Sequence, residues 1–246
     1  MGQIIAVVSG KGGTGKTSFV SHVGLYLAKL GNRVLCVDCD IGLRNLDIAL
    51  GMSDCAVTDF TDVLEGRYSL KEAATPHPIQ KNLYLLTAPS NPSRPIDAAA
   101  FARLMDQVRR SFDYCLVDAA AGLGSGFRLS VTNCDRCVVV TTTDPTSLRD
   151  AQRTVMELGH LRNGRVHMVV NRCKKKLLKT LRQTIDDAID TAGLPLLGVV
   201  PDDEDLPVAL GRGIPLLFMY NRCASVAYCN IARRLTGERV PLMRIK

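Results

Sequence analysis

The sequence lacks several features that mark specialised classes of protein. It contains no tryptophan and its aromatic content is 5%, which disfavours a surface that stacks the bases of single-stranded nucleic acid. No stretch reaches the roughly 18 uninterrupted apolar residues that a membrane-spanning helix needs. The first residues carry no basic segment and no small-residue cleavage site, so no signal peptide is predicted. These absences favour a cytoplasmic protein.

The nine cysteines are an odd number scattered through apolar segments, which favours reduced thiols over a disulfide framework. Cys36-x-x-Cys39 and Cys134-x-x-Cys137 have the spacing of half-sites for zinc or an iron–sulfur cluster. Cys36 and Cys39, however, belong to or border a β-branched run, and residues three apart on a strand face opposite sides. We therefore expect small core residues and no metal site at these cysteines.

Acidic residues are missing from one long stretch. Between Leu161 and Arg182 there are basic residues and no aspartate or glutamate, in a chain with a net charge of +7 and a pI near 9.0. Such a cluster can attract DNA or anionic lipid through a salt-sensitive, sequence-independent attraction. It can equally be a solvated face that only aids solubility. The sequence leaves both interpretations open.

The chain alternates β-branched runs with helical stretches, which is typical of a parallel sheet covered on both faces. We expect an α/β fold with a doubly wound, mostly parallel sheet, and one domain over residues 1–246. Residues 54–82 are expected to hold short helices and a proline-containing loop. The predicted strands are Ile4–Ser9, Arg33–Val37, Leu83–Thr87, Tyr114–Val117, Arg136–Thr141, Val166–Val170 and Pro195–Val200. The predicted helices are Lys16–Leu30, Asp97–Arg110, Ser147–Leu161, Leu177–Ala192, Asp205–Gly211 and Cys223–Leu235.

A glycine-rich loop follows the first predicted strand and opens the first predicted helix. It satisfies G-x-x-x-x-G-K-[ST], in which backbone N–H groups and the helix N-terminus surround phosphate oxygens. Lys16 would reach the β- and γ-phosphates, and the Thr17 hydroxyl would ligate Mg²⁺. The residues predicted to bind a nucleotide here are Gly10, Lys11, Gly12, Gly13, Thr14, Gly15, Lys16, Thr17 and Ser18.

Carboxylates stand at the carboxyl ends of two further predicted strands, where ligands of open parallel sheets bind. Asp38 and Asp40 follow one strand, and Asp118 follows the apolar Tyr114–Val117 run as in a Walker B segment. Carboxylates crowded beside a triphosphate need a bound cation or nearby lysines. We therefore expect Asp118 to hold Mg²⁺ opposite Thr17.

The loop contains a second lysine, Lys11, so that it reads K-G-G-x-G-K-T. This motif resembles the deviant Walker A motif of the MinD/ParA family of P-loop NTPases. The resemblance implies that Lys11 crosses a dimer interface to the phosphates of the partner's ATP. It also implies an ATP-dependent homodimer, in which Lys11, Lys16 and Asp40 carry the catalysis.

Further segments extend the resemblance. In the run Asp40–Ile48, the family match implies that Asp40 positions the attacking water and that Asp38 links nucleotide state to the switch. Gly122 matches the last position of the family's D-x-x-A-G switch, which can sense the γ-phosphate. Ala119 and Ala120 stand where MinD proteins usually have Ser-Pro.

The base of the nucleotide has its own candidate contacts. Asn171 and Arg172 follow one predicted strand and Pro201 follows another. An asparagine amide offers the donor and acceptor that an adenine edge needs. The matching positions in the MinD/ParA family contact the base through side chain and backbone.

The resemblance implies a slow Mg²⁺-dependent ATPase whose dimerisation controls spatial positioning, most directly of the division septum. It implies an activating or effector protein as partner and a peripheral association with the inner face of the cell membrane. The C-terminal helix spacing, however, is most simply core packing, and Pro241 interrupts the tail. One alternative is a ParA-like partition ATPase that binds DNA nonspecifically through residues 161–182. A second alternative is a nucleotide-gated adaptor that scarcely hydrolyses ATP. A third is an amidotransferase-type ligase, although the sequence contains no recognisable substrate-binding segment for one.

Overall fold

The computed structural model describes residues 1–246 except 42, 54, 91–94, 162–163, 175–184 and 244–246. One eight-stranded sheet, in the order β3-β4-β2-β5-β1-β6-β7-β8, forms the centre of the molecule. The short edge strand β3 pairs antiparallel with β4, while the other strand pairs are parallel. The strands are β1 (Gln3–Val8), β2 (Val34–Cys39), β3 (Thr75–Pro76), β4 (Leu83–Leu86), β5 (Tyr114–Ala119), β6 (Arg136–Thr141), β7 (Val166–Cys173) and β8 (Leu196–Pro201).

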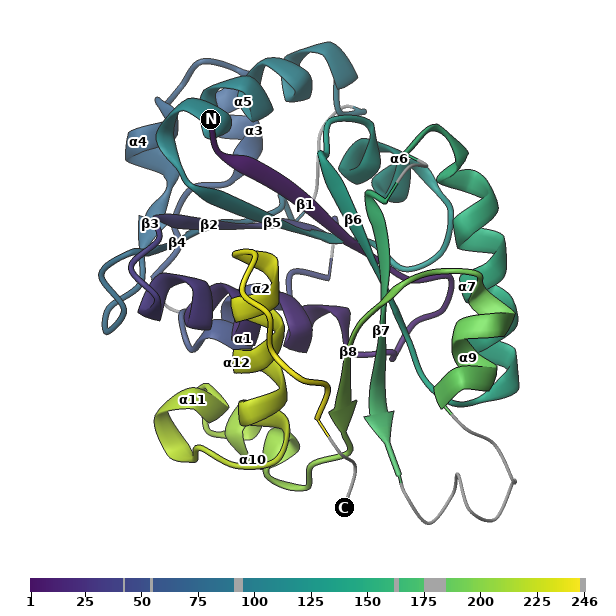
Figure 1. Ribbon diagram of the computed structural model, residues 1–246. Helices are drawn as coiled ribbons and strands as arrows, with labels where there is room; N and C mark the ends of the chain where they lie inside the picture. The colour runs from purple at the N-terminus through teal and green to yellow at the C-terminus, as the bar shows by residue number, and fades with distance from the viewer. Residues whose placement is uncertain (42, 54, 91–94, 162–163, 175–184, 244–246) are drawn as a thin grey trace.

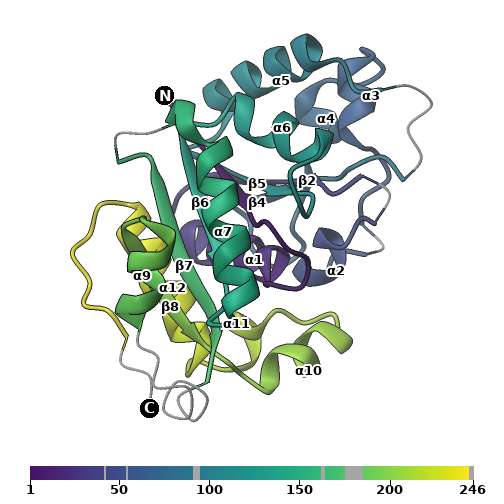
Figure 2. The same ribbon diagram turned by 90° about the vertical axis from the view of Figure 1, so that its right-hand side faces the viewer.

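Helices cover both faces of this sheet (Figures 1 and 2). One face carries α1 (Lys16–Lys29), α2 (Leu46–Leu50), α10 (Asp205–Gly211), α11 (Leu216–Met219) and α12 (Ala224–Leu235). The other carries α3 (Phe60–Leu64), α4 (Leu70–Ala73), α5 (Ala98–Ser111), α6 (Ser125–Thr132), α7 (Pro145–Glu157) and α9 (Ile185–Ala192). A 3₁₀ turn, η1 (Gly159–Leu161), follows α7.

The central strands are mostly apolar because both of their faces are buried. Along β1, Ile4 and Ala6 belong to the core under α5–α9, while Ile5 and Val7 belong to the core under α1 and α12. Cys36 and Cys39 of β2 also divide between the two cores, as the strand period requires. Both thiols are buried, and burial raises the pKa of each.

The mostly parallel, two-faced α/β architecture confirms the predicted fold class. The seven predicted strands are present: Arg136–Thr141 has the predicted bounds, and the other six have shifted ends. One shift corrects a prediction about the site. β7 continues to Cys173, so Asn171 and Arg172 lie within the strand and not in a loop after it. Arg172 has a φ of +54° and the β7–β8 register is irregular there, so the strand is bulged.

Similarly, Asp38 and Asp118 lie inside β2 and β5, since both strands run further than their apolar residues indicate. The predicted short helices of residues 54–82 are present as α3 and α4, whereas α2, α6 and α11 were not predicted. The first half of the predicted helix Leu177–Ala192 lies outside the described residues, and α9 matches its second half. Within the described ranges, no helix is both long and apolar enough to cross a bilayer.

Candidate functional site

The glycine-rich loop between β1 and α1 is held closely against β7. Gly15 has a φ of +91°, and a Cβ atom built there would lie 2.2 Å from Nδ2 of Asn171. That Nδ2 atom donates a hydrogen bond of 2.8 Å to the Thr14 carbonyl oxygen. Both the backbone conformation and this close approach require glycine at position 15. Asn171 thus holds the loop in shape, a role that its predicted contact with a base did not include.

Lys16 begins α1 and turns its ammonium group back into the loop. Its Nζ donates to the Ser9 hydroxyl at 3.0 Å, and that hydroxyl donates to the Lys11 carbonyl oxygen at 2.7 Å. Burial lowers the pKa of Lys16, while the charges of Asp118 and Asp40 oppose this shift. The lysine is therefore a desolvated donor aimed at the space inside the loop, although Ser9 was not among the predicted site residues.

Thr17 and Asp118 meet where α1 begins and β5 ends. The Thr17 hydroxyl donates to Oδ2 of Asp118 at 2.6 Å. Asp118 is buried, and its Oδ1 has no hydrogen-bond partner among the described residues. Burial, together with the nearby charges of Asp38 and Asp40, raises the pKa of Asp118 to about 7 against the opposing effects of Thr17 and Lys16.

This pair of oxygen donors fits a hard divalent cation. A buried carboxylate oxygen without a partner is destabilising unless something compensates it. Mg²⁺ prefers oxygen ligands and is bound in many nucleotide sites by one carboxylate, one hydroxyl and phosphate oxygens. Thr17 and Asp118, the predicted magnesium ligands, therefore lie together with oxygen atoms that suit this ion.

Asp38 is the second buried carboxylate at this edge of the sheet. Its Oδ1 accepts the Asp40 N–H at 2.8 Å and its Oδ2 accepts the Leu46 N–H at 3.2 Å. Burial raises the pKa of Asp38 to about 6, although these two backbone hydrogen bonds lower it. Asp38 thereby fixes the backbone on which the half-buried Asp40 stands, which is consistent with a link between the site and the following segment.

A cavity of about 480 Å³ opens over the loop and α1. Its walls come from the glycine loop, the segment after β2, the bulged end of β7, the end of β8, α10 and α12. Lys11, Asp38, Gly122 and Asp118 do not line it. The lining residues are Gly12, Gly13, Gly15, Lys16, Thr17, Ser18, Asp40, Leu43, Asn45, Ala121, Asn171, Arg172, Pro201, Asp202, Asp203, Leu206, Pro207, Leu210 and Tyr228.

Another part of the cavity wall comes from the ends of β7 and β8 and from α10. Pro201 ends β8 there and Pro207 belongs to α10. The exposed Arg172 donates to the Gly13 carbonyl oxygen at 3.3 Å and pairs with Asp202 at 3.5 Å. The structure thus brings Asn171, Arg172 and Pro201 together beside the phosphate loop, as their predicted contact with one ligand requires.

Gly122 lies outside the cavity but contacts the loop. Its N–H donates to the Ser9 carbonyl oxygen at 3.3 Å, and its φ of +82° is a conformation that favours glycine. The segment after β5 and the phosphate loop are therefore joined through Ser9, so a change in either can reach the other.

Lys11 points away from the loop and contacts the amino end of α7. Its Nζ donates to the Thr146 hydroxyl at 2.9 Å and lies 3.4 Å from Oδ2 of Asp144. Asp144 caps α7, and although slight burial acts in the opposite direction, hydrogen bonds from Ser147 and Thr146 lower its pKa to about 2. The Asp-Pro pair after β6 is a helix-start signal that could have located this cap, but sequence alone did not connect it to Lys11.

Comparison with known proteins gives a family whose description agrees with this geometry. Residues 5–216 match the model of the CobQ/CobB/MinD/ParA nucleotide-binding domain. The chain is 39% identical to septum site-determining protein MinD of Thermotoga maritima, over 98% of this chain and 91% of that protein. It is 37% identical to MinD of Bacillus subtilis, over 98% and 92% of the two chains.

Solved structures are similar over nearly the same length. The MinC:MinD cell division protein complex of Aquifex aeolicus contains a chain with a TM-score of 0.90 and 36% identity, covering 98% of both chains. MinD of Pyrococcus horikoshii, solved with Mg-ADP, has a TM-score of 0.82 and 26% identity, covering 96% of both.

Proposed function

Because the chain belongs to the CobQ/CobB/MinD/ParA family of nucleotide-binding domains, we propose that it is a MinD-like, Mg²⁺-dependent ATPase that acts in placing the division septum. The observation that carries the ATPase proposal is the Thr17–Asp118 pair, whose carboxylate has an unpartnered oxygen, beside a cavity lined by Thr17 and Lys16. The septum proposal rests on the full-length similarity to proteins named for that role.

The proposed chemistry is phosphoryl transfer to water, which depends mainly on positioning and charge stabilisation. Thr17 and Asp118 would hold Mg²⁺, which when bound neutralises charge on the phosphates. Lys16 supplies a desolvated ammonium group, and desolvation strengthens its attraction for the phosphate oxygens. Asp40, which lines the cavity, is the proposed residue that orients the attacking water.

We further propose that ATP drives formation of a homodimer through Lys11. In the single chain this lysine does not line its own cavity and is held by Asp144 and Thr146, half exposed at the surface. It is therefore available to a second copy once that exposed contact, which is weak in water, is exchanged for a triphosphate.

Replacement of Lys11 by alanine is expected to abolish ATP-dependent dimerisation while the single chain still binds ATP. Size-exclusion chromatography with ATP and with ADP measures the first effect, and nucleotide titration measures the second. Lys29→Ala is the matched control, because Lys29 ends α1 at the opposite end of the sheet. A Lys11→Ala protein that still dimerises with ATP would refute the proposed role.

An activating or effector protein partner is part of the proposal, since a relative of known structure forms a complex with MinC. Two features of the structure concern whether the dimer binds a membrane or DNA. Tyr228, Ile231 and Leu235 of α12 are buried against the core, so the described part of this helix is not a free membrane anchor. Most of the basic cluster at 161–182 lies outside the described residues, while Arg172 and Lys174 pair with Asp202.

Binding to anionic liposomes and to DNA, each with ATP over a salt series, tests the choice of surface. We expect lipid binding with a protein partner present and only weak DNA binding. DNA affinity that falls steeply with salt, beside negligible lipid binding, would instead indicate a partition ATPase. Phosphate release measured in the same samples distinguishes an ATPase from a nucleotide-gated adaptor.

A further inference from the structure

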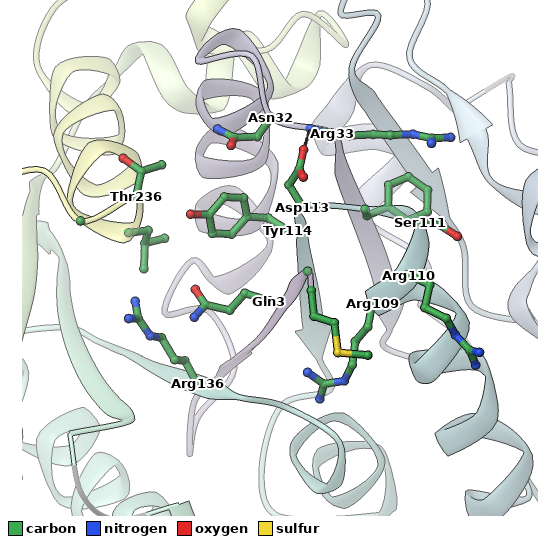
Figure 3. Close-up of a pocket in the computed structure, with 15 residues that line it drawn as sticks. Gln3, Asn32, Arg33, Arg109, Arg110, Ser111, Asp113, Tyr114, Arg136 and Thr236 are labelled. Atoms are coloured by element: carbon green, nitrogen blue, oxygen red, sulfur yellow. Dashed lines mark hydrogen bonds between the residues drawn. The ribbon is translucent and has the colours of Figure 1, made fainter.

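A second cavity lies at the amino ends of the strands, at the opposite end of the sheet from the phosphate loop (Figure 3). Its volume is about 670 Å³, within the range of small-molecule sites. Four arginines line it, and Asp113 is the only carboxylate among the lining residues. These arginines are Arg33, Arg109, Arg110 and Arg136.

Three of these arginines have partners within the protein. Arg109 binds Asp135 and the Asn133 carbonyl oxygen, and Arg110 donates to the Asp106 carbonyl oxygen. The guanidinium of Arg33 lies over the rings of Tyr84 and Phe112, at 5.3 and 5.0 Å from their centroids. Asp113 is also occupied, since it accepts the Arg33 N–H at 2.7 Å.

Arg136 differs from the other three. It is half-buried at the start of β6, and its guanidinium makes no hydrogen bond or ion pair with any residue that the structure describes. The charge of Arg136 acts on two neighbouring side chains. Burial lowers the pKa of His167, and the positive charge of Arg136 lowers it further. Burial raises the pKa of Tyr114, and Arg136 opposes that rise. A half-buried cation without a counter-charge is destabilising, so a bound anion would stabilise it.

Two neutral polar side chains share the face of the sheet to which Arg136 belongs. In the ladder Gln3 pairs with Tyr114, and Ile5 pairs with Arg136. Residues two apart on a strand face the same side, and Ile5 packs in the core under α12. Figure 3 shows the Gln3 amide and the Tyr114 ring on the same side as the Arg136 guanidinium, toward Thr236. Neither the Gln3 amide nor the Tyr114 hydroxyl has a hydrogen bond to a described residue.

The carboxyl end of α12 does not require the positive charge of Arg136. Three carbonyl groups in the last turn of α12, those of Ala232, Arg233 and Arg234, already accept backbone N–H groups. The last turn of α12 also contains its own arginines, Arg233 and Arg234. The negative end of this helix is therefore satisfied without Arg136.

We propose that this cavity binds a small molecule bearing an oxyanion, a phosphate or a carboxylate, with Arg136 as the charged contact and Gln3 and Tyr114 as neutral hydrogen-bonding groups. A guanidinium binds both oxyanions through paired N–H donors. The cavity exceeds the size of either group alone, which leaves room for the rest of a small organic anion.

Calorimetric titration with inorganic phosphate and, separately, with succinate tests the proposal and distinguishes the two oxyanions. The protein is first saturated with a nonhydrolysable ATP analogue and Mg²⁺, so that the phosphate loop does not bind the probe. We expect one of the probes to bind at a single site and Arg136→Gln to weaken that binding at least about tenfold. Affinity for the ATP analogue is expected to stay unchanged, which shows that the variant is folded.

Arg103→Gln is the matched control. Arg103 is an exposed residue of α5 that does not line the cavity, so this substitution removes the same charge elsewhere on the surface. Its affinity for the probe should equal that of the unmodified protein. Failure of both probes to bind, or an equal loss of affinity in both variants, would overturn the proposal. Loss of analogue binding in the unmodified protein would count against the proposed ATPase function and not against this second site.

Discussion

Replacement of Asp118 by asparagine is expected to make the nucleotide-free protein more stable while it removes Mg²⁺-dependent ATP hydrolysis. A rise in pKa from the ordinary value to about 7 corresponds to about 4 kcal/mol of destabilisation when the carboxylate is fully ionised. The asparagine amide would remain poorly satisfied at the buried Oδ1 position, which costs about 1–3 kcal/mol. The net gain at pH 8 is therefore about 2 kcal/mol, or a melting temperature higher by about 5 °C.

The pH dependence separates this effect from a change in packing. Because the pKa of Asp118 is raised by folding, the folded state holds more protons than the unfolded chain between about pH 4 and 7. The free energy of unfolding of the unmodified protein therefore falls as pH rises through this window and Asp118 ionises. The difference in stability between Asp118→Asn and the unmodified protein should grow from pH 5 to pH 8. Thermal denaturation in EDTA measures it, with Asp106→Asn, an exposed carboxylate of α5, as control. An advantage that is constant across this range would contradict the assignment to a buried charge.

Replacement of Asp40 by alanine is expected to lower the rate of ATP hydrolysis by at least about a hundredfold, because a residue that positions the attacking water contributes about that much or more. ATP binding should persist, since the loop, Lys16 and Thr17 remain. The ATP-bound dimer should therefore accumulate. Phosphate release gives the rate, and size-exclusion chromatography with ATP gives the fraction of dimer.

Two comparisons make this experiment specific. Asp40→Asn keeps the size of the side chain and removes its charge, so a loss equal to that of alanine would assign the effect to charge. Asp106→Ala, far along α5, should hydrolyse ATP at the unmodified rate. Hydrolysis by Asp40→Ala within a few-fold of the unmodified protein would mean that another group orients the water.

The fold class could be predicted because local signals agreed with the tertiary structure. The central strands are mostly apolar, and Gly31, with a φ of +94°, follows the end of α1 as expected for a helix stop. The strand order could not be predicted, because pairing depends on contacts between distant segments. The helix α6 was missed since it follows a short glycine-containing segment, Gly122–Gly124, and has few apolar residues in helical spacing.

In the candidate site, too, features carried by local motifs could be predicted, and features that depend on distant contacts could not. The phosphate loop and its two carboxylate strands are local motifs, and the structure places Lys16, Thr17 and Asp118 together. The hydrogen bond from Asn171 to Thr14 joins residues far apart in the chain, so no local pattern indicates it. The cavity around Arg136 also depends on three strands and the ends of α5 and α12 meeting at the amino ends of the strands, where no ligand was expected.

The enclosure of α1 limits how the molecule can respond to its nucleotide. Residues Phe19–Ala28 are buried, and a Cβ at Gly24 would lie 2.6 Å from Sγ of Cys36. On its other side His22 stacks on Tyr228 and Tyr26 bonds to Ser225. A helix so tightly surrounded cannot slide or tilt without opening the interior. Exchange of one nucleotide for another must therefore be accommodated by the backbone around Gly10–Gly15 and Gly122, which leaves the helix as a fixed base for both.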